Sequence, residues 1–341
     1  MAKPFKINLA LQGGGAHGAV TWGVLQRLLE DDRLELEAIS GSSAGAVNAV
    51  ALAYGLHKNG RDGAMETLEQ LWRRVSDAGS VYSPVNTAPS DVFGLSAIAN
   101  ALTYQMFETM TRSFSPYQFN PFNINPLKDI LEDIIEFDAL RRCKVTKLFL
   151  AATNVRSGKV KVFETKDVSA DVVGASACLP FLFKAVEVDG EHYWDGGYMG
   201  NPVLFPFFYE ASSADVMIVH VNPIERDDLP VTPSAIMNRI NEISFNSSLL
   251  RELRAISFVH RLLDDGWLKE THRDRLRDVR IHSIRSDEAL VEFDNVSKFR
   301  IDWPFLTDLK KRGYDIADAW LKENCTKIGK ESSVDLRAMF E

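Results

Sequence analysis

Residues 7–45 read INLALQGGGAHGAVTWGVLQRLLEDDRLELEAISGSSAG, and the order of elements within them determines the architecture of the chain. The apolar run at residues 7–12 predicts a buried strand, and the spacing of apolar residues over 19–30 predicts a helix. A second short strand follows at residues 36–40, and a helix rich in small residues follows at 46–56. Strand, helix, strand, helix is the beginning of a parallel α/β sheet.

Later segments continue this α/β pattern as far as residue 222. Apolar runs and turn residues predict helices at residues 63–77 and 126–136 and in the segment 171–181, strands at 147–153 and 160–165, a hairpin at 185–197 and a last strand at 215–221. The hairpin carries Asp189-Gly190 at its tip, a pair that favours the tight turns of two-residue hairpins. We therefore expect an α/β core over residues 6–222.

Two regions depart from this pattern. Residues 80–125 hold many prolines, asparagines and aromatic residues, and we expect them to form an insertion, either a lid or a wall of the site. Residues 223–341 contain a long amphipathic helix at 234–263 and a charged helix at 308–324, so we expect a helical extension packed on the core.

Composition excludes several classes of protein. The formal net charge is −8, whereas nucleic-acid binding needs a dense basic surface. Three scattered cysteines give no disulfide framework, and no apolar run reaches the roughly 18 residues of a membrane span. The beginning of the chain does not resemble a signal peptide, so we expect a cytoplasmic protein. No spacing of histidines, cysteines or carboxylates indicates a metal site, and we expect no cofactor.

The segment Gly41-Ser42-Ser43-Ala44-Gly45 lies between a predicted strand and a predicted helix. This is the G-x-S-x-G pattern of a nucleophile elbow in the context that the pattern requires. Gly41 and Gly45 allow the sharp turn, and Ser43 then lies at a helix N-terminus, where partial positive charge favours an oxyanion. We predict that Ser43 is a nucleophile.

A glycine cluster, GGGAHG, follows the first predicted strand at residues 13–18. Glycine runs at this position present backbone N–H groups to an anion, as the tetrahedral intermediate of acyl transfer requires. Gly13, Gly15 and Gly18 also satisfy the dinucleotide fingerprint G-x-G-x-x-G. That fingerprint needs an acidic residue at the end of the second strand, where this chain has Ser40-Gly41.

A third motif, Asp195-Gly196-Gly197, follows a predicted strand far downstream. By itself, Asp-Gly is an ordinary turn. Beside the other two motifs, Asp195 becomes the natural acid/base partner of Ser43.

With the three motifs in this order, the chain resembles the patatin-like phospholipase family over roughly residues 6–222. The resemblance implies a three-layer α/β/α fold with a mostly parallel sheet, and a Ser-Asp dyad without histidine. It implies hydrolysis of fatty acyl esters, with a lipid or acyl-ester substrate. Apart from the resemblance, transient contact with a membrane surface is an open alternative to packing for the amphipathic segments. The resemblance maps the oxyanion hole onto Gly13, Gly14 and Gly15. The family often has arginine or lysine where this chain has His17, so the resemblance supplies no fixed positive charge there.

Two alternatives remain open. One is an α/β-hydrolase triad of Ser43, Asp195 and His220, which occur in the chain order of that fold. Only 42 residues precede Ser43, however, and that fold places several strands before its nucleophile. The other alternative is a non-catalytic lipid-binding protein that has kept the fold.

Overall fold

A computed structural model describes residues 4–82, 109–111, 113–268, 270–273, 275–293 and 296–340. In these ranges, eight strands form one sheet in the order β5-β6-β3-β2-β1-β7-β8, with β4 paired to β3 outside this path. The strands are β1 (Phe5–Leu11), β2 (Leu34–Gly41), β3 (Lys147–Asn154), β4 (Val160–Glu164), β5 (Val186–Val188), β6 (Glu191–Asp195), β7 (Asp215–Val219) and β8 (Arg280–Ile284).

The centre of the sheet is parallel, as the sequence predicts. β1 pairs in parallel with β2 and β7, β2 with β3, and β7 with β8. The antiparallel pairs, β3–β4, β3–β6 and β5–β6, all lie at one edge. The predicted hairpin is present there as β5–β6, and Asp189 and Gly190 at its tip both have positive φ, at 52° and 77°. The carboxyl ends of β1 and β2 therefore lie side by side.

The edge of β3 that faces β2 passes from one partner to another along its length. β2 occupies this edge up to the pair Gly41–Leu150. Ala152 and Thr153 pair with β4 on one edge and with β6 on the other, so β6 continues where β2 stops. The pair Ala152–Asp195 then sets the end of β6 against the end of β2. This change of partner along β3 places Asp195 beside the turn that follows β2.

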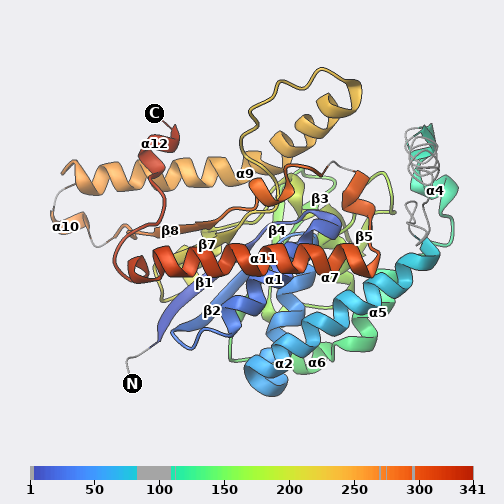
Figure 1. Cartoon of the computed structure of the whole chain (residues 1–341), viewed down its shortest axis with the longest axis horizontal. Helices are drawn as coiled ribbons and strands as arrows, with labels where there is room; N and C mark the ends of the chain where they lie inside the picture. The colour runs from blue at the N-terminus through green and yellow to red at the C-terminus, as the bar shows by residue number, and fades with distance from the viewer. Residues whose placement is uncertain are drawn as a thin grey trace.

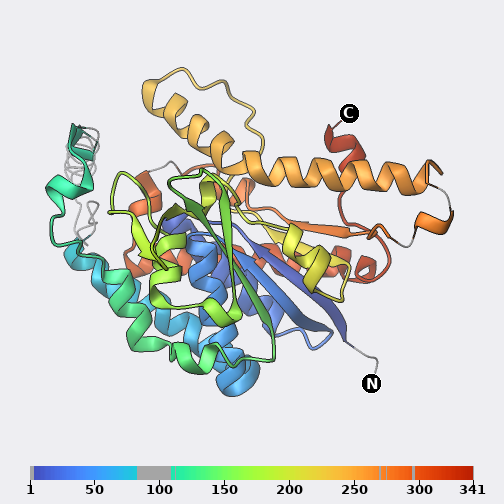
Figure 2. The same ribbon diagram turned by 180° about the vertical axis from the view of Figure 1, so that it is seen from behind.

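Helices cover both faces of the sheet, which gives three layers (Figures 1 and 2). Alternation along β1 divides the core: Leu9 and Leu11 belong to one apolar cluster, and Ala10 belongs to the other. The first cluster lies under α1 (Gly18–Leu29), α2 (Ala44–Tyr82), α5 (Pro126–Ile134), α6 (Phe137–Leu140) and α11 (Trp303–Asn324). The second lies under α8 (Phe205–Glu210), α9 (Pro233–Asp264) and α12 (Leu336–Phe340).

The remaining helices are short: α4 (Pro116–Phe119), α7 (Ala170–Ser176) and α10 (Glu270–Arg273). The two helices predicted at 46–56 and 63–77 fall within α2, which is broken at Asn59 and Gly60 by non-helical backbone angles. None of the helices in the described ranges combines the length and apolar character needed to cross a membrane.

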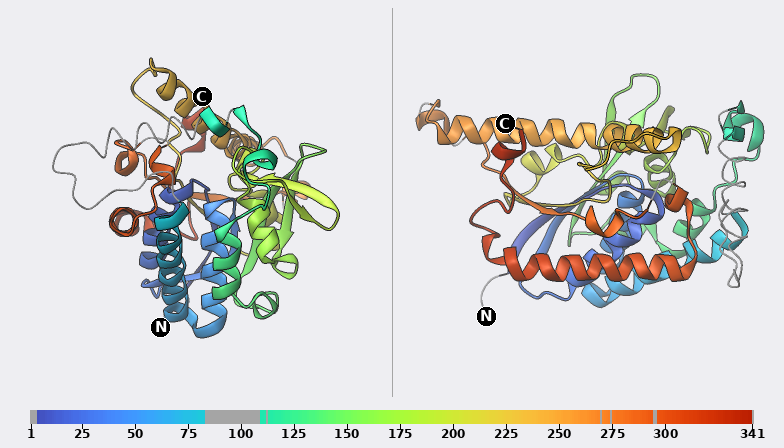
Figure 3. Two further views of the ribbon diagram at one scale, coloured as in Figure 1. Left: turned by 90° about the vertical axis from the view of Figure 1, so that its right-hand side faces the viewer. Right: turned by 45° about the horizontal axis from the view of Figure 1, so that its top comes forward.

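The C-terminal region is helical, but it also completes the sheet. The sequence predicted that β7 would be the last strand, and this was wrong. A further strand, β8, follows it in the chain and pairs with it in parallel. α11 begins at Trp303, earlier than predicted, because Asp302 caps it through a 3.1 Å bond from the Phe305 N–H to Oδ1. α11 packs closely on α1, since Gly23 faces the backbone of Lys310 and Gly313 faces that of Val20. Figure 3 shows α11 and α9 on opposite sides of the sheet.

The predicted insertion at residues 80–125 is described only in part. Residues 83–108 and 112 lie outside the described ranges. The end of the insertion, from α4 to Asn125, is described, and Phe119, Ile124 and Asn125 line the cavity reported below. That part contributes to the wall of the cavity, and the choice between a lid and a wall for the whole insertion stays a prediction. The division of the chain at residue 222 stays a prediction.

Candidate active site

Ser43 lies at the turn between β2 and α2 with a φ of 55°, a left-handed conformation that costs energy in a residue with a side chain. Gly41 and Gly45 flank it, and a Cβ atom on Gly41 would lie 2.6 Å from the Gly45 carbonyl oxygen. Strand and helix thus approach at a distance that only glycine permits. The backbone is that of a nucleophile elbow.

Neighbouring side chains hold the elbow in place. The Ser43 N–H donates to Ser176 at the end of α7, with 3.1 Å to Oγ and 3.1 Å to the carbonyl oxygen. Ser176 in turn donates from Oγ to the Ala151 carbonyl at 2.7 Å. Ser42 is fully buried and donates its hydroxyl to the Gly200 carbonyl. Ser42 is therefore engaged in the fold, whereas Ser43 lines a cavity.

Asp195 is the last residue of β6 and is completely buried. Its N–H donates to the Cys178 carbonyl at 2.7 Å, and its Oδ1 accepts from the Gly197 N–H at 2.7 Å. Its Oδ2 is buried and has no hydrogen-bond partner among the residues that the structure describes. One oxygen therefore orients the carboxyl group, and the other is available for a proton.

Burial raises the pKa of Asp195 to about 7, although the hydrogen bond from the Gly197 N–H and the proximity of the Ser43 side chain act in the opposite direction. Ser43 is therefore close enough to favour the charged carboxylate, yet Oδ2 has no partner at hydrogen-bonding distance among the described residues. Catalytic hydrogen bonds are often long before substrate binds. A carboxyl group with a pKa near neutrality can take a proton from serine, which an ordinary aspartate does poorly.

The glycine loop lies against the elbow. A Cβ atom on Gly13 would lie 2.5 Å from Cβ of Ser43. The Gly13 N–H already donates to Asn201 Oδ1 at 2.7 Å. The N–H groups of Gly14 and Gly15 have no acceptor among the described residues, and Gly15 lines the same cavity as Ser43. Of the three predicted donors, the N–H groups of Gly14 and Gly15 are thus unpaired among the described residues, and Gly15 is the one that lines the cavity.

A buried polar network supports this loop from behind. Gln12 Oε1 accepts from the N–H groups of Val221 at 2.9 Å and Asn222 at 3.0 Å. Its Nε2 donates to Asn246 Oδ1 at 3.0 Å and to the Asn201 carbonyl at 3.2 Å. The network ties the end of β1 to the end of β7 and to α9. Because both partners of each bond are buried, the network fixes the path of the loop.

Among the described residues, no hydrogen bond joins His220 or His17 to Ser43. His220 is buried just after β7, and burial lowers its pKa to about 4, with further effects from Asp287 and Arg285 rather than from Asp195. His17 is buried, and burial and then Lys298 lower its pKa to about 3, so its ring is neutral. Its Nε2 bonds to Ser297 Oγ at 2.7 Å.

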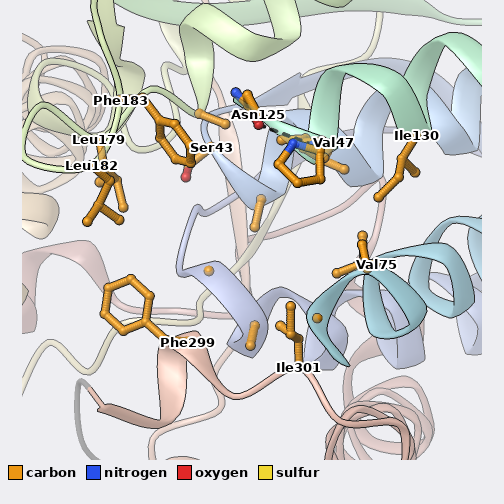
Figure 4. Close-up of a pocket in the computed structure, with 18 of the residues that line it drawn as sticks. Ser43, Val47, Val75, Asn125, Ile130, Leu179, Leu182, Phe183, Phe299 and Ile301 are labelled. Atoms are coloured by element: carbon orange, nitrogen blue, oxygen red, sulfur yellow. Dashed lines mark hydrogen bonds between the residues drawn. The ribbon is translucent and has the colours of Figure 1, made fainter. Parts of the chain in front are cut away.

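A cavity of about 410 Å³ opens beside Ser43. This volume lies within the range of small-ligand sites. Most of its walls are apolar, and Figure 4 shows Leu179, Leu182 and Phe183 on one side, Val75 and Ile130 on the other, and Phe299 and Ile301 across from the serine. Asn125 and Lys298 also line it. The cavity suits a chain of methylene groups that ends at Ser43.

The sequence model described as "Patatin-like phospholipase" matches residues 9–208, which is more than half of the 341 residues. The chain belongs to the patatin-like phospholipase family. The match covers the glycine loop, the elbow and Asp195 of this patatin-like chain. The three-layer fold with a mixed sheet agrees with the assignment.

Solved structures with some similarity to this patatin-like protein include VipD from Legionella pneumophila, at 17% identity and a TM-score of 0.43, covering 94% of this chain and 67% of VipD. Another is the ExoU–SpcU complex of the Pseudomonas aeruginosa type III secretion system, at 17% identity and a TM-score of 0.34, covering 96% of this chain and 61% of the other. The chain thus spans about two thirds of the length of these proteins. No curated protein sequence is a significant match. The family assignment rests on the sequence model.

The patatin-like fold thus brings together the residues predicted from the sequence, Ser43, Asp195 and the glycine loop. Sequence reasoning missed Ser176, Asn201, Asn222 and Lys298. Ser176 lies in the small-residue run ASAC at residues 175–178, which could have indicated it, whereas the other three carry no local signal. In the described ranges, no group of three or more metal-ligating side chains is present.

Proposed function

We propose that this protein hydrolyses fatty acyl esters of lipids, with Ser43 as nucleophile and Asp195 as general acid and base. The observation that carries the proposal is the pairing of a strained serine at the mouth of an apolar cavity with a buried carboxyl group whose pKa is raised to about 7. Ser43 is the nucleophile, Asp195 can act as a base because burial raises its pKa, and the cavity has room for the acyl chain.

In the acylation step, Ser43 Oγ forms a bond to the ester carbonyl carbon while its proton passes to Asp195. The tetrahedral intermediate then collapses, the bond to the alcohol oxygen breaks, and the departing alcohol takes the proton from Asp195. An acyl group remains on Ser43. Asp195 is suited to both transfers because a pKa near the working pH balances its strength as a base and as an acid.

In the deacylation step, water gives a proton to Asp195 and adds to the acyl carbonyl carbon. Collapse of this second intermediate breaks the bond to Ser43 Oγ, which recovers its proton from Asp195, and a fatty acid leaves. The N–H groups of Gly14 and Gly15 stabilise the oxyanion in both steps. Such donors are each worth roughly 10²–10³ in kcat.

The test is release of fatty acids from a mixed lipid extract by the purified protein, followed by mass spectrometry. EDTA is included, because the proposed groups need no metal. We expect fatty acid release by the wild-type protein and none by Ser43→Ala. Equal release by both proteins, or release only after calcium is added, would contradict the proposal. Binding of lipid without release by the wild-type protein would favour the non-catalytic alternative.

A further inference from the structure

The short 3₁₀ helix η5 (Val296–Phe299) lies directly on the glycine loop. Gly15 has a φ of 60°, and a Cβ atom on it would lie 2.6 Å from the Lys298 carbonyl oxygen. His17, two residues further along, bonds to Ser297. A segment of the C-terminal region thus covers the loop that is proposed to hold the oxyanion.

Lys298 is joined to this loop by two hydrogen bonds in series. Its Nζ donates to Asn222 Oδ1 at 3.0 Å, and Asn222 Nδ2 donates to the Gly13 carbonyl oxygen at 2.7 Å. The peptide unit that carries this carbonyl also carries the N–H of Gly14. A cation at Oδ1 polarises the Asn222 amide and strengthens its Nδ2 donor, which draws electron density toward the Gly13 oxygen. Hydrogen bonds in such a chain strengthen one another, so the Gly14 N–H becomes a better donor.

Among the described residues, Lys298 is the positively charged side chain that this chain of hydrogen bonds connects to the glycine loop. No salt bridge joins it to a described carboxylate, and Glu242, the acid whose charge reaches it, is already bound to Arg226 at 2.6 Å and Arg239 at 3.1 Å. His17, which belongs to the glycine loop itself, supplies no charge, because burial and then Lys298 lower its pKa to about 3.

We propose that Lys298 is a positioning residue that acts through Asn222 to orient and polarise the Gly13–Gly14 peptide. The C-terminal region thereby supplies the positive charge that the glycine loop itself lacks. This inference rests on the proposed function, because the Gly14 N–H matters only if an oxyanion forms beside Ser43.

The charge on Lys298 is sensitive to pH near neutrality. Burial lowers its pKa to about 8; Arg226 acts in the same direction and Glu242 in the opposite one. His17, the other titratable group that faces it, stays neutral in this range. Loss of the proton from Lys298 would therefore weaken the oxyanion donor, and kcat should fall as the pH rises through about 8. Arginine stays charged there.

The test measures kcat and KM on a short, uncharged, water-soluble ester such as p-nitrophenyl butyrate. We expect Lys298→Met to lower kcat roughly tenfold with little change in KM. This decrease is smaller than the roughly 10²–10³ expected when a whole oxyanion donor is lost, because the Gly14 N–H is weakened and not removed. Asn222→Leu should lower kcat at least as much, and the double variant should be no worse than Asn222→Leu alone. Lys311→Met, which removes an exposed charge from α11, is the matched control and should behave as wild type.

Several results would overturn the inference. An unchanged kcat in Lys298→Met would do so, and so would additive losses in the double variant, which would place the lysine outside the Asn222 chain. A higher KM for phospholipids with normal turnover of the uncharged ester would mean that Lys298 binds a phosphate instead. If Lys298→Met fails to fold, Lys298→Arg provides the test. Its kcat should not fall as the pH rises above about 8, and a fall equal to that of the wild-type protein would refute the inference. Failure of the proposed function is recognised separately: the Ser43→Ala variant would then be as active as the wild-type protein.

Discussion

Gly13 and Ser43 each lie two residues beyond the end of a different strand, yet a single methyl group on Gly13 would lie 2.5 Å from the serine Cβ. They meet because β1 and β2 are parallel neighbours whose carboxyl ends coincide, with Leu11 paired to Gly41. The donor loop and the nucleophile are therefore held at one distance by the sheet and not by either loop alone.

Gly13→Ala should consequently abolish activity, since the added Cβ must displace either Ser43 or the loop. We expect a loss of at least about 10² in kcat, as for loss of an oxyanion donor, and weak labelling by a fluorophosphonate probe. Gly174→Ala is a suitable control, because Gly174 lies within the α7 helix and nothing lies within 4 Å of its added Cβ. Normal labelling of a folded Gly13→Ala protein would contradict the proposed placement of the loop.

The probe should label Ser43 and neither neighbouring serine. Ser42 donates to the Gly200 carbonyl, and Ser40 lies fully buried within β2. Ser43→Ala should remove the label, and peptide mass spectrometry should locate the label on Ser43 in the wild-type protein. The assignment is wrong if Ser43→Ala is still labelled while Ser42→Ala is not.

Asp195→Asn and His220→Gln distinguish the dyad from the triad. With Asp195 as the only side-chain base, Asp195→Asn should lower kcat by about 10²–10⁴, the usual contribution of a general base. His220→Gln should keep most of the activity, because the charges that act on His220 are those of Asp287 and Arg285. Circular dichroism verifies folding. A folded but inactive His220→Gln protein would favour the triad.

Ile130→Trp should narrow the cavity at a wall that lies across from Leu179 and Leu182 (Figure 4). Esters with long acyl chains should lose about tenfold in kcat/KM, since each excluded methylene group is worth roughly 1–3 kcal/mol, while short esters should still be cleaved. Ile134→Trp is the control, because Ile134 is buried on the same helix but does not line the cavity. Equal losses on long and short esters would show that Ile130 is only part of the core.

The raised pKa of Asp195 should also appear in stability. Its pKa is about 7 in the folded protein and ordinarily 3.8, so between these values the folded state keeps a proton that the unfolded chain releases. The free energy of unfolding contributed by this group therefore falls as the pH rises through this interval. Asp195→Asn stays neutral, so its advantage in melting temperature over wild type should grow from pH 4 to pH 7 and then level off. Ser43→Ala, which keeps Asp195, should show no such growth; a constant advantage for Asp195→Asn would refute the pKa shift.

Local patterns were sufficient for the elements that carry the motifs. The β1 and β2 strands, the elbow and the Asp189-Gly190 hairpin each follow from a short run of residues, so they could be predicted. The position of Asp195 at the elbow could not, since it depends on β6 taking over the edge of β3 from β2. That exchange of partners has no signature in the sequence.

β8 was missed because its buried face is partly charged. Arg280 and His282 both bond to Asp215 of β7, at 2.7–2.9 Å, and this pairing hides polar residues inside the sheet. The side chains of Arg280 and His282 bond to a residue 65 or more positions away in the sequence. The segment therefore lacks the continuous apolar run by which a buried strand is recognised. Lys298 and Asn222 were missed for the same reason, because their role exists only in the folded chain.

The packing of Gly23 and Gly313 between α1 and α11 has a genetic consequence. A stop codon shortly after residue 222 would leave Ser43, Asp195 and the glycine loop fully translated. The product would nevertheless lack α11 over α1 and β8 beside β7, so it would expose an apolar helix face and an unpaired strand edge that invites aggregation. Nonsense mutations in the codons between residue 222 and β8 should therefore be as damaging as those that remove the serine.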